Sequence, residues 1–306
     1  MKNNVTSFRF PLHFPLHIGE VKMELITSVL NQKLHRESSP YSEYLPSILR
    51  VMGKEQGLTE KDLTIIYLTI LLRCISIEQL YRLLYLPNNM TQRACQLRVQ
   101  ILIEKQLLSK LDRRLGGLTQ GSAFTVISPG ILTCRYINAR HRYFKTATGG
   151  HLIMHSLTIT EIFTQILEAN IKKQFKLIHI QTEPVCWREY RYFNHPAVKL
   201  KPDLYVEIKR DDISFRWFIE VDRGTLSKAK IQEKAWYYEK YFLDSLEQRK
   251  TGILPRTLWI TLDKDRAKYI LSAISKTNQY VPGLCDSVSI DKFIIKLTEI
   301  NSKQYK

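Results

Sequence analysis

The chain has 306 residues, of which 44% are hydrophobic, a composition that supports packed cores and excludes a wholly disordered protein. Its 46 Lys and Arg residues outnumber its 29 Asp and Glu residues, which gives a formal net charge of +17. Such an excess favours a polyanionic partner, because each Lys or Arg that meets a phosphate releases a condensed counterion. Nucleic acid is the first expectation, an acidic membrane surface the second, and a charge that only keeps the protein in solution the third.

The five cysteines are widely spread and include no C-x-x-C pair, so neither a disulfide framework nor a zinc knuckle is indicated. The N-terminal residues lack the continuous apolar stretch of a signal peptide. No uncharged apolar run reaches the roughly 20 residues that a bilayer requires. We therefore expect a reduced, cytoplasmic compartment without a membrane partner, in which the protein associates with the nucleoid or a plasmid.

Residues 1–55 have the weakest pattern, with prolines and scattered basic residues. They are assigned to an N-terminal extension, either an arm that touches DNA or a partner, or a poorly packed segment. Residues 56–130 are clearer. Thr59 and Ser76 are predicted helix N-caps, and each is followed three residues later by a side chain with capping-box spacing. Pro87 ends the second of these helices.

A third helix is predicted from Thr91 to Leu108, and its apolar face is expected to contain Ala94, Leu97, Ile101 and Leu102. A β-hairpin follows, with residues 110–114 and 124–127 as strands around a Gly116-Gly117 turn. The order helix, helix, turn, helix, hairpin is that of a winged helix-turn-helix, in which the third helix enters the major groove. A helical module for protein contacts is the alternative.

In that geometry the start of the third helix reads base edges, and the hairpin lies over a flanking groove or phosphates. The predicted DNA-binding side chains are Thr91, Gln92, Arg93 and Gln96 on the helix, and Arg113 and Arg114 on the hairpin. Residues 131–150, in which basic and aromatic side chains interleave, are the predicted basic linker.

Residues 151–306 form the predicted second domain, an α/β sheet flanked by helices. The predicted order is helix, three strands, helix, strand and helix: 155–170, 175–182, 200–208, 215–221, 226–246, 256–262 and 265–275. Two neighbouring strands carry Asp203 and Glu220, and strands joined by a hairpin lie about 5 Å apart. The two carboxylates are therefore expected to converge, either on a Mg²⁺ ion or in salt bridges with Lys201, Arg216 or Arg223.

The Pro202-Asp203 pair and the later run Glu220-Val221-Asp222-Arg223-Gly224-Thr225 resemble the signature of the bacterial replication-relaxation family. Further positions match in order: His155, Trp187, Glu189, Lys234, Tyr238, Trp259-Ile260-Thr261 and Arg266-Ala267. The resemblance covers about residues 60–275. It implies a protein of plasmid replication and mobilisation, in which a winged helix-turn-helix precedes a mixed-sheet domain of the PD-(D/E)XK restriction-endonuclease type.

Carried over to this chain, the resemblance implies that Asp203 and Glu220 hold Mg²⁺ or Mn²⁺, and that Glu161 is the additional acid that many such nucleases have. The family of nucleases has a lysine two residues after the second acid, whereas this chain has Asp222 there. Either Asp222 adds a third carboxylate to the metal site, or Lys234, at the edge of an apolar helix stripe, replaces the missing lysine.

The expected function is a metal-dependent DNA endonuclease or nickase of a plasmid or mobile element, acting on double-stranded DNA. Other replication or relaxosome proteins and a second copy of the chain are the expected protein partners. The alternative is a catalytically inactive, nuclease-like DNA-binding regulator or relaxosome accessory protein, and the replacement of lysine by Asp222 favours it.

Overall fold

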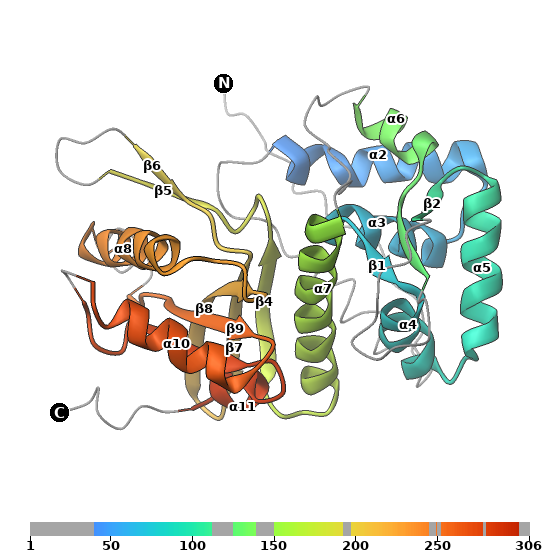
Figure 1. The fold of residues 1–306 in the computed structure, drawn as a ribbon. Helices are drawn as coiled ribbons and strands as arrows, with labels where there is room; N and C mark the ends of the chain where they lie inside the picture. Colours follow the sequence, from blue (N-terminus) through green and yellow to red (C-terminus); the bar gives the residue numbers. More distant parts are fainter. Residues whose placement is uncertain are drawn as a thin grey trace, which may run out of the picture.

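The structure is a computed structural model, and Figure 1 shows its fold. It describes residues 40–111, 125–138, 150–191, 197–244, 249, 252–277 and 280–299. The first described element is helix α2 (Pro40–Gln56), which packs against α3 (Glu60–Leu72) through Leu45, Leu49 and Met52. The end of the predicted N-terminal extension is therefore a packed helix, while residues 1–39 lie outside the described residues.

The two predicted N-caps are confirmed as complete capping boxes. Thr59 accepts from the backbone N–H of Asp62, whose carboxylate in turn accepts from the Thr59 N–H at 2.8 Å. Ser76 and Gln79 make the same reciprocal pair, with both bonds at 3.1 Å. Each box satisfies two of the backbone donors that a helix start leaves without intrahelical partners.

The helix predicted from 77 to 86 is divided into three short pieces. It begins as α4 (Ile77–Leu80), widens into the π-helix η1 (Tyr81–Tyr85) and tightens into the 3₁₀ turn η2 (Leu86–Asn88), which contains Pro87. Helix α5 (Gln92–Glu104) follows, with Thr91 as its N-cap. It ends before the predicted Leu108, because Gln106 has a left-handed φ of 57° and Leu108 already belongs to a strand.

The predicted apolar face of α5 is partly wrong. Cys95, Val99 and Leu102 are the buried residues of the helix, at spacings of four and three. Leu97 and Ile101, which were predicted to be buried, are 49% and 39% exposed. The predicted stripe omitted Cys95, which behaves here as a small apolar residue and sets the buried face about one residue away.

A small antiparallel sheet completes the first part of the structure, which we call the helical part because most of it is helices α2 to α5. The strands lie in the order β1-β3-β2: β1 (Ile75–Ser76), β3 (Val126–Pro129) and β2 (Leu108–Leu111). The antiparallel pairing of β2 with β3 confirms that the two predicted hairpin strands pair, although both begin and end at other residues than predicted, and residues 112–124 lie outside the described residues. Helix α6 (Ile131–Asn138) then opens the predicted linker, of which residues 139–149 are not described. Gly130 lets the backbone before α6 pass close to the backbone at Gln106. A Cβ at this position would lie 2.2 Å from the Gln106 carbonyl oxygen.

The second part contains a mixed five-stranded sheet flanked by helices, as predicted. Its order is β10-β9-β8-β7-β4; β4, β7 and β8 are antiparallel, and β8, β9 and β10 are parallel. The strands are β4 (Lys176–Thr182), β7 (Leu204–Arg210), β8 (Ile213–Asp222), β9 (Arg256–Thr261) and β10 (Cys285–Ser289). The predicted strand 200–208 is interrupted near Pro202. Its start is β6 (Val198–Leu200), which pairs with β5 (Arg188–Tyr190) in a separate ladder.

Helices cover both faces of the large sheet (Figure 1). Alternation along β8 sends Trp217, Ile219 and Val221 to the core of α7 (Gly150–Ile171), and Phe218 to the opposite core. That opposite core is closed by α8 (Lys228–Asp244) and α10 (Lys264–Ile274), and α11 (Phe293–Leu297) packs at the edge. Helix α7 also contacts α3, β1, α4 and η1, so it lies between the sheet and the helical part.

Candidate functional site

The two predicted strand acids lie on neighbouring strands at one end of the sheet. Asp203 comes directly before β7, and its backbone N–H donates to the Ile219 carbonyl at 3.0 Å. The Asp203 carboxylate accepts from the Val221 N–H at 2.7 Å, so it is held against β8 on both sides of Glu220. Asp203 is 6% exposed and Glu220 only 1%. The pairing of β7 with β8 thus places two buried carboxylates side by side.

Helix α8 adds two polar side chains to this pair. Lys234 Nζ donates to one oxygen of Glu220, and the Tyr238 hydroxyl donates to the other at 2.5 Å. The two residues are one helical turn apart and therefore share a face. Ile231, Ala235 and Tyr238 form the buried stripe of α8, and Lys234, with 39% of its side chain exposed, lies at the edge of that stripe. The lysine thus reaches the carboxylate from the solvent side.

His155 and Glu183 were not predicted as site residues. His155, from α7, has its Nε2 3.2 Å from an Asp203 oxygen. Glu183 follows β4, the strand next to β7, and pairs with Arg73 at 3.0 Å. The order of strands β4 and β7 could have indicated Glu183 as a third acid at this sheet end. For His155 the resemblance gave a matching position but no role.

The environment pushes the pKa values of the two central acids apart. Burial opposes the ionisation of Asp203, but the His155 hydrogen bond and the charge of Lys234 outweigh it and lower its pKa. Burial raises the pKa of Glu220 to about 7, against the opposing charge of Lys234. Burial also raises the pKa of Glu183. Two acids with divergent pKa values are the arrangement that acid–base chemistry uses.

Asp222 lies apart from this group. Its carboxylate pairs with Arg266 Nε at 2.6 Å and accepts from the Gly224 N–H at 3.1 Å. Gly224 has a φ of +85°, which favours glycine, so the carboxylate fixes the sharp turn from β8 toward α8. The buried ion pair neutralises Asp222. It is held as an anchor of the turn rather than as a third carboxylate beside Glu220.

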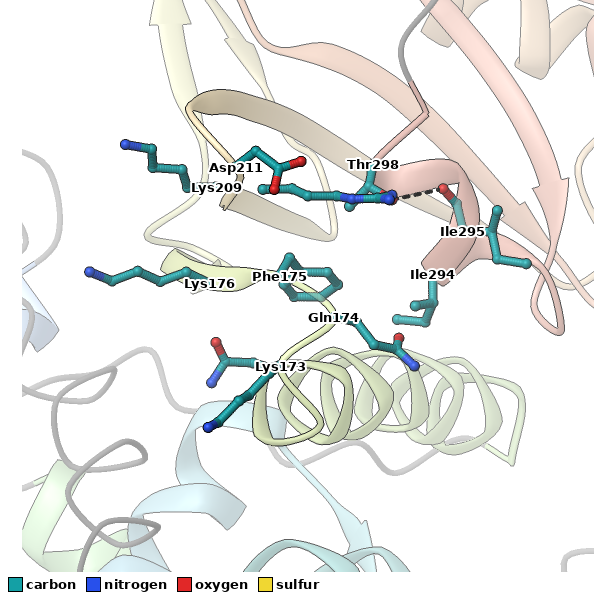
Figure 2. A pocket seen from close by; sticks show the side chains of 11 residues that line it. Lys173, Gln174, Phe175, Lys176, Lys209, Asp211, Ile294, Ile295 and Thr298 are labelled. Carbon is teal, nitrogen blue, oxygen red and sulfur yellow. Dashed lines mark hydrogen bonds between the residues drawn. The ribbon is translucent and has the colours of Figure 1, made fainter.

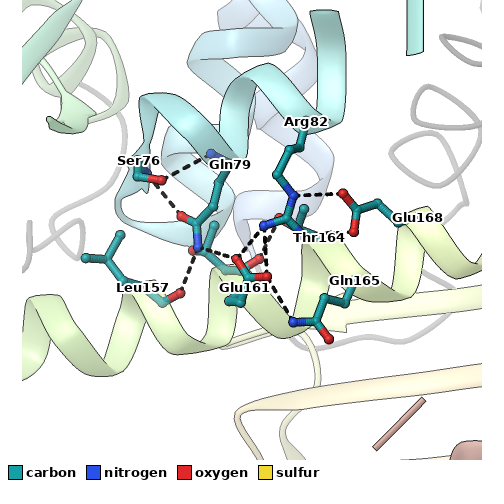
Figure 3. Close-up of polar contacts among 9 residues, drawn as sticks. Ser76, Gln79, Arg82, Leu157, Glu161, Thr164, Gln165 and Glu168 are labelled. Atoms are coloured by element: carbon teal, nitrogen blue, oxygen red, sulfur yellow. Dashed lines mark hydrogen bonds and ion pairs between the residues drawn. The ribbon is translucent and has the colours of Figure 1, made fainter. Parts of the chain in front are cut away.

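Glu161 also lies apart, on the face of α7 that meets the helical part. Figure 3 shows its carboxylate with Arg82, Gln79 and Gln165, at distances of 2.9 to 3.0 Å. Arg82 pairs with Glu168 at 2.8 Å as well. Six positions of α7 separate Glu161 from His155, about 600° of rotation, so the two side chains point in different directions. The structure does not bring Glu161 to Asp203 and Glu220.

The chemistry of the two central acids suits a hard divalent cation, since carboxylate oxygens are the ligands that Mg²⁺ and Mn²⁺ prefer. Every oxygen of Asp203 and Glu220 already has a protein partner: His155, the Val221 N–H, Lys234 and Tyr238. Within the described part of the chain, no group of three His, Cys, Asp or Glu side chains is arranged to hold a metal ion. The two carboxylates would therefore share a cation with water or substrate oxygens.

The predicted base-reading residues lie on the open side of α5. Thr91, Gln92, Arg93 and Gln96 are all exposed, and the Thr91 hydroxyl also caps the helix by accepting from the Ala94 N–H at 3.2 Å. Arg98, on the same helix, is held instead by a bidentate pair with the buried Asp62 of α3. The predicted hairpin arginines Arg113 and Arg114 lie outside the described residues.

A pocket of about 960 Å³ opens at the other end of β7 from Asp203 (Figure 2). Its basic rim and apolar wall are formed by Lys173, Lys176, Lys209, Arg210, Ile294 and Ile295. No predicted site residue lines it. Lys209 is partly neutralised by Asp212 at 3.3 Å, and Arg210 donates to Thr298 at 3.1 Å.

Across the ranges that the structure describes, every helix is too short or too polar to cross a bilayer. No curated protein and no solved structure was found to match the chain. The model of one family, replication-relaxation, matches residues 70–257, more than half of the 306-residue chain. The matched segment contains β1, α5 and the acids at the sheet end, and it extends beyond Lys234 and Tyr238. The chain belongs to the replication-relaxation family.

Proposed function

We propose that this protein binds DNA in the replication or relaxation of a plasmid or other mobile element, and that it cleaves phosphodiester bonds at Asp203, Glu220 and Lys234. The observation that carries the proposal is the contact of Lys234 with Glu220. This contact brings a lysine to Glu220, the neighbour of Asp203 at one end of the sheet, although residue 222 is an aspartate. The family description supports the role in replication or relaxation.

The order of elements in the helical part supports a winged helix-turn-helix. Helix α3, strand β1, helices α4 and α5, and strands β2 and β3 follow one another, and the three strands form one antiparallel sheet. In this arrangement α5 would enter the major groove with Gln92, Arg93 and Gln96, which are exposed, toward base edges. Residues 56–130 would thus form the unit that selects the DNA site.

The second part supports a nuclease-like fold. Helix α7, the antiparallel strands β4, β7 and β8, helix α8 and the parallel strand β9 follow the order predicted from the sequence pattern, and the family resemblance implies a mixed sheet of this kind. We place the boundary of this domain near residue 150. The contacts of α7 with both parts would fix the position of the reading helix relative to the sheet.

Each side chain has a distinct role in this proposal. The His155 hydrogen bond and the Val221 N–H orient Asp203 and favour its ionised form. Lys234 supplies a positive charge for a phosphate oxygen and a donor that orients the attacking water. Tyr238 fixes Glu220 from the other side. Mg²⁺ or Mn²⁺, held by Asp203 and Glu220, would supply charge neutralisation and water activation when bound.

The experiment is relaxation or cutting of supercoiled plasmid by the purified full chain with Mg²⁺ or Mn²⁺. Asp203→Asn should abolish the activity and leave DNA binding intact, because asparagine retains the shape of the side chain and one oxygen that can accept from the Val221 N–H. Glu161→Gln is the matched control, since it neutralises an acid of α7 that lies away from the site. Equal activity of wild type and Asp203→Asn would show that the acids do not carry cleavage.

A second candidate is a DNA-binding regulator or relaxosome accessory protein without cleavage. The full engagement of the Asp203 and Glu220 oxygens by protein donors favours it. Calorimetric titration with Mn²⁺ separates the two candidates. Absence of metal binding, together with sequence-specific retention of DNA, supports the regulator; metal binding that Asp203→Asn removes supports the nuclease.

A further inference from the structure

Strands β5 and β6 form a two-stranded arm that extends away from the large sheet (Figure 1). Their register pairs Glu189 with Lys199 and Tyr190 with Val198. Tyr190 is buried against α8, and its hydroxyl donates to the Tyr237 carbonyl at 3.1 Å. The end of β5 is therefore fixed to the helix that carries Lys234.

The other face of the arm carries an aromatic ring with two cations. Lys201 Nζ lies 5.0 Å from the centre of the Trp187 ring, and Lys199 Nζ lies 5.8 Å from it. Both distances are within the range of a cation–π interaction. Both lysines are exposed, whereas Trp187 is half-buried. One indole thus holds two ammonium groups at the surface; we call these three residues the Trp187 platform.

The platform is joined to the candidate site through the backbone. Lys201 precedes Asp203 by two residues, and the Cys186 thiol donates to the Pro202 carbonyl at 3.0 Å. This contact holds the segment before Trp187 against the segment that leads into Asp203. The backbone segments that carry Trp187 and Lys201 are therefore held together directly before Asp203.

Among the residues that the structure describes, the charges of the platform are not neutralised by ion pairs. Glu189 is the cross-strand neighbour of Lys199, yet among the described residues no ion pair involves Lys199 or Lys201. An exposed lysine normally loses side-chain entropy when it binds a phosphate. Contact with the indole restricts both side chains in advance, which lowers that loss.

We propose that the Trp187 platform binds the phosphate backbone of DNA next to the candidate cleavage site, with Lys199 and Lys201 on neighbouring phosphates and Trp187 as the part that positions them. This inference rests on the proposed DNA-binding function and names the surface that would carry substrate to Asp203 and Glu220. It assigns a role to Trp187, which the family resemblance had marked without explaining it.

The test is the equilibrium affinity of the full chain for a short DNA duplex as a function of salt concentration, without divalent metal, so that binding is measured apart from cleavage. Lys199→Gln with Lys201→Gln should lower the slope of log affinity against log salt by about 1.8, because each phosphate contact contributes about 0.9. The control, Lys172→Gln with Lys173→Gln, removes the same charge from exposed positions at the end of α7. It should leave the slope nearly unchanged.

Trp187 variants separate positioning from charge. Trp187→Leu keeps both lysines and should lower affinity about fivefold at constant salt, because the ammonium groups lose their support. Trp187→Phe retains an aromatic face and should restore most of that affinity, and thermal melting of each variant checks its fold. Equal slopes for the two lysine pairs, or unchanged affinity of a folded Trp187→Leu, would overturn the platform alone. Absence of DNA binding by the wild type would overturn the proposed function and the platform together.

Discussion

Two groups of charged residues in this protein, one partly buried and one with buried acids, use their acids in opposite ways. Between the helical part and α7, Arg82 lies between Glu161 and Glu168, and burial of Glu161 is outweighed by hydrogen bonds and by Arg82, so its pKa is lowered. At the sheet end, Lys234 pairs with Glu220 beside the second acid, Asp203, and burial raises the pKa of Glu220 to about 7. The first group gives both acids the same arginine partner and joins two parts of the protein. The second group holds a carboxyl group whose pKa is near 7, which costs stability when the group ionises, and functional sites often contain such groups.

The largest expected effect concerns Glu220→Gln. If the acids at the sheet end form the cleavage site, the rate of DNA cleavage should fall about 10³-fold. A metal-binding carboxylate accounts for several kcal/mol of transition-state stabilisation. The free energy of unfolding should change by less than about 1 kcal/mol, because removal of the buried Glu220 charge offsets the lost ion pair, and Lys234, with 39% of its side chain exposed, keeps its contact with water. Plasmid relaxation and urea denaturation measure the two quantities. A large loss of stability with unchanged cleavage would reverse the assignment.

The same residue predicts a pH dependence of stability. The folded-state pKa of Glu220, about 7, is above its ordinary value of 4.5, so the folded state binds the extra proton between these values. Stability contributed by this group is therefore present below about pH 4.5 and lost as the pH rises through about 7. Denaturation at several pH values should show this fall in the wild type and not in Glu220→Gln. Parallel curves for the two proteins would contradict it.

Arg82→Met tests the other group. It leaves Glu161 and Glu168 without their cation, and it should lower the free energy of unfolding by about 2 kcal/mol, less than for a deeply buried pair because the three side chains keep about a quarter of their surface exposed. Urea denaturation gives the value. DNA cleavage should remain within a few-fold of wild type, and a selective loss of cleavage would assign Glu161 to the chemistry after all.

The smallest expected effect is at Asp62→Asn, in the α3 capping box. Burial opposes the ionisation of Asp62, but hydrogen bonds from Arg98 and Thr59 outweigh it and lower its pKa below 3.8. This contribution is present above about pH 3.8 and lost as the pH falls through the folded-state value. The variant should lose about 1 to 2 kcal/mol at neutral pH and little in acid. A destabilisation independent of pH would point to packing instead of charge.

Local signals were sufficient to predict the capped helix starts and most strands of the sheet. Thr59 and Ser76 act through residues three positions away, so the sequence shows the whole interaction. Asp222 and Glu161 could not be placed in this way. Their partners, Arg266 and Arg82, are 44 and 79 residues distant, and only the packing of α10 and η1 brings them together. Alternation along β8 puts Glu220 and Asp222 on one face, but it does not reveal which cation each meets.

Lys234 tests the central claim most directly, because its contact with Glu220 is the observation on which cleavage depends. The measurement is the single-turnover rate of plasmid cleavage by Lys234→Met in Mg²⁺ and in Mn²⁺, with Lys230→Met, an exposed lysine one turn away on α8, as the matched control. Loss of one such donor predicts a rate about 10²- to 10³-fold below wild type, with DNA affinity retained and the control unaffected. Equal rates for Lys234→Met and the wild type would contradict the account.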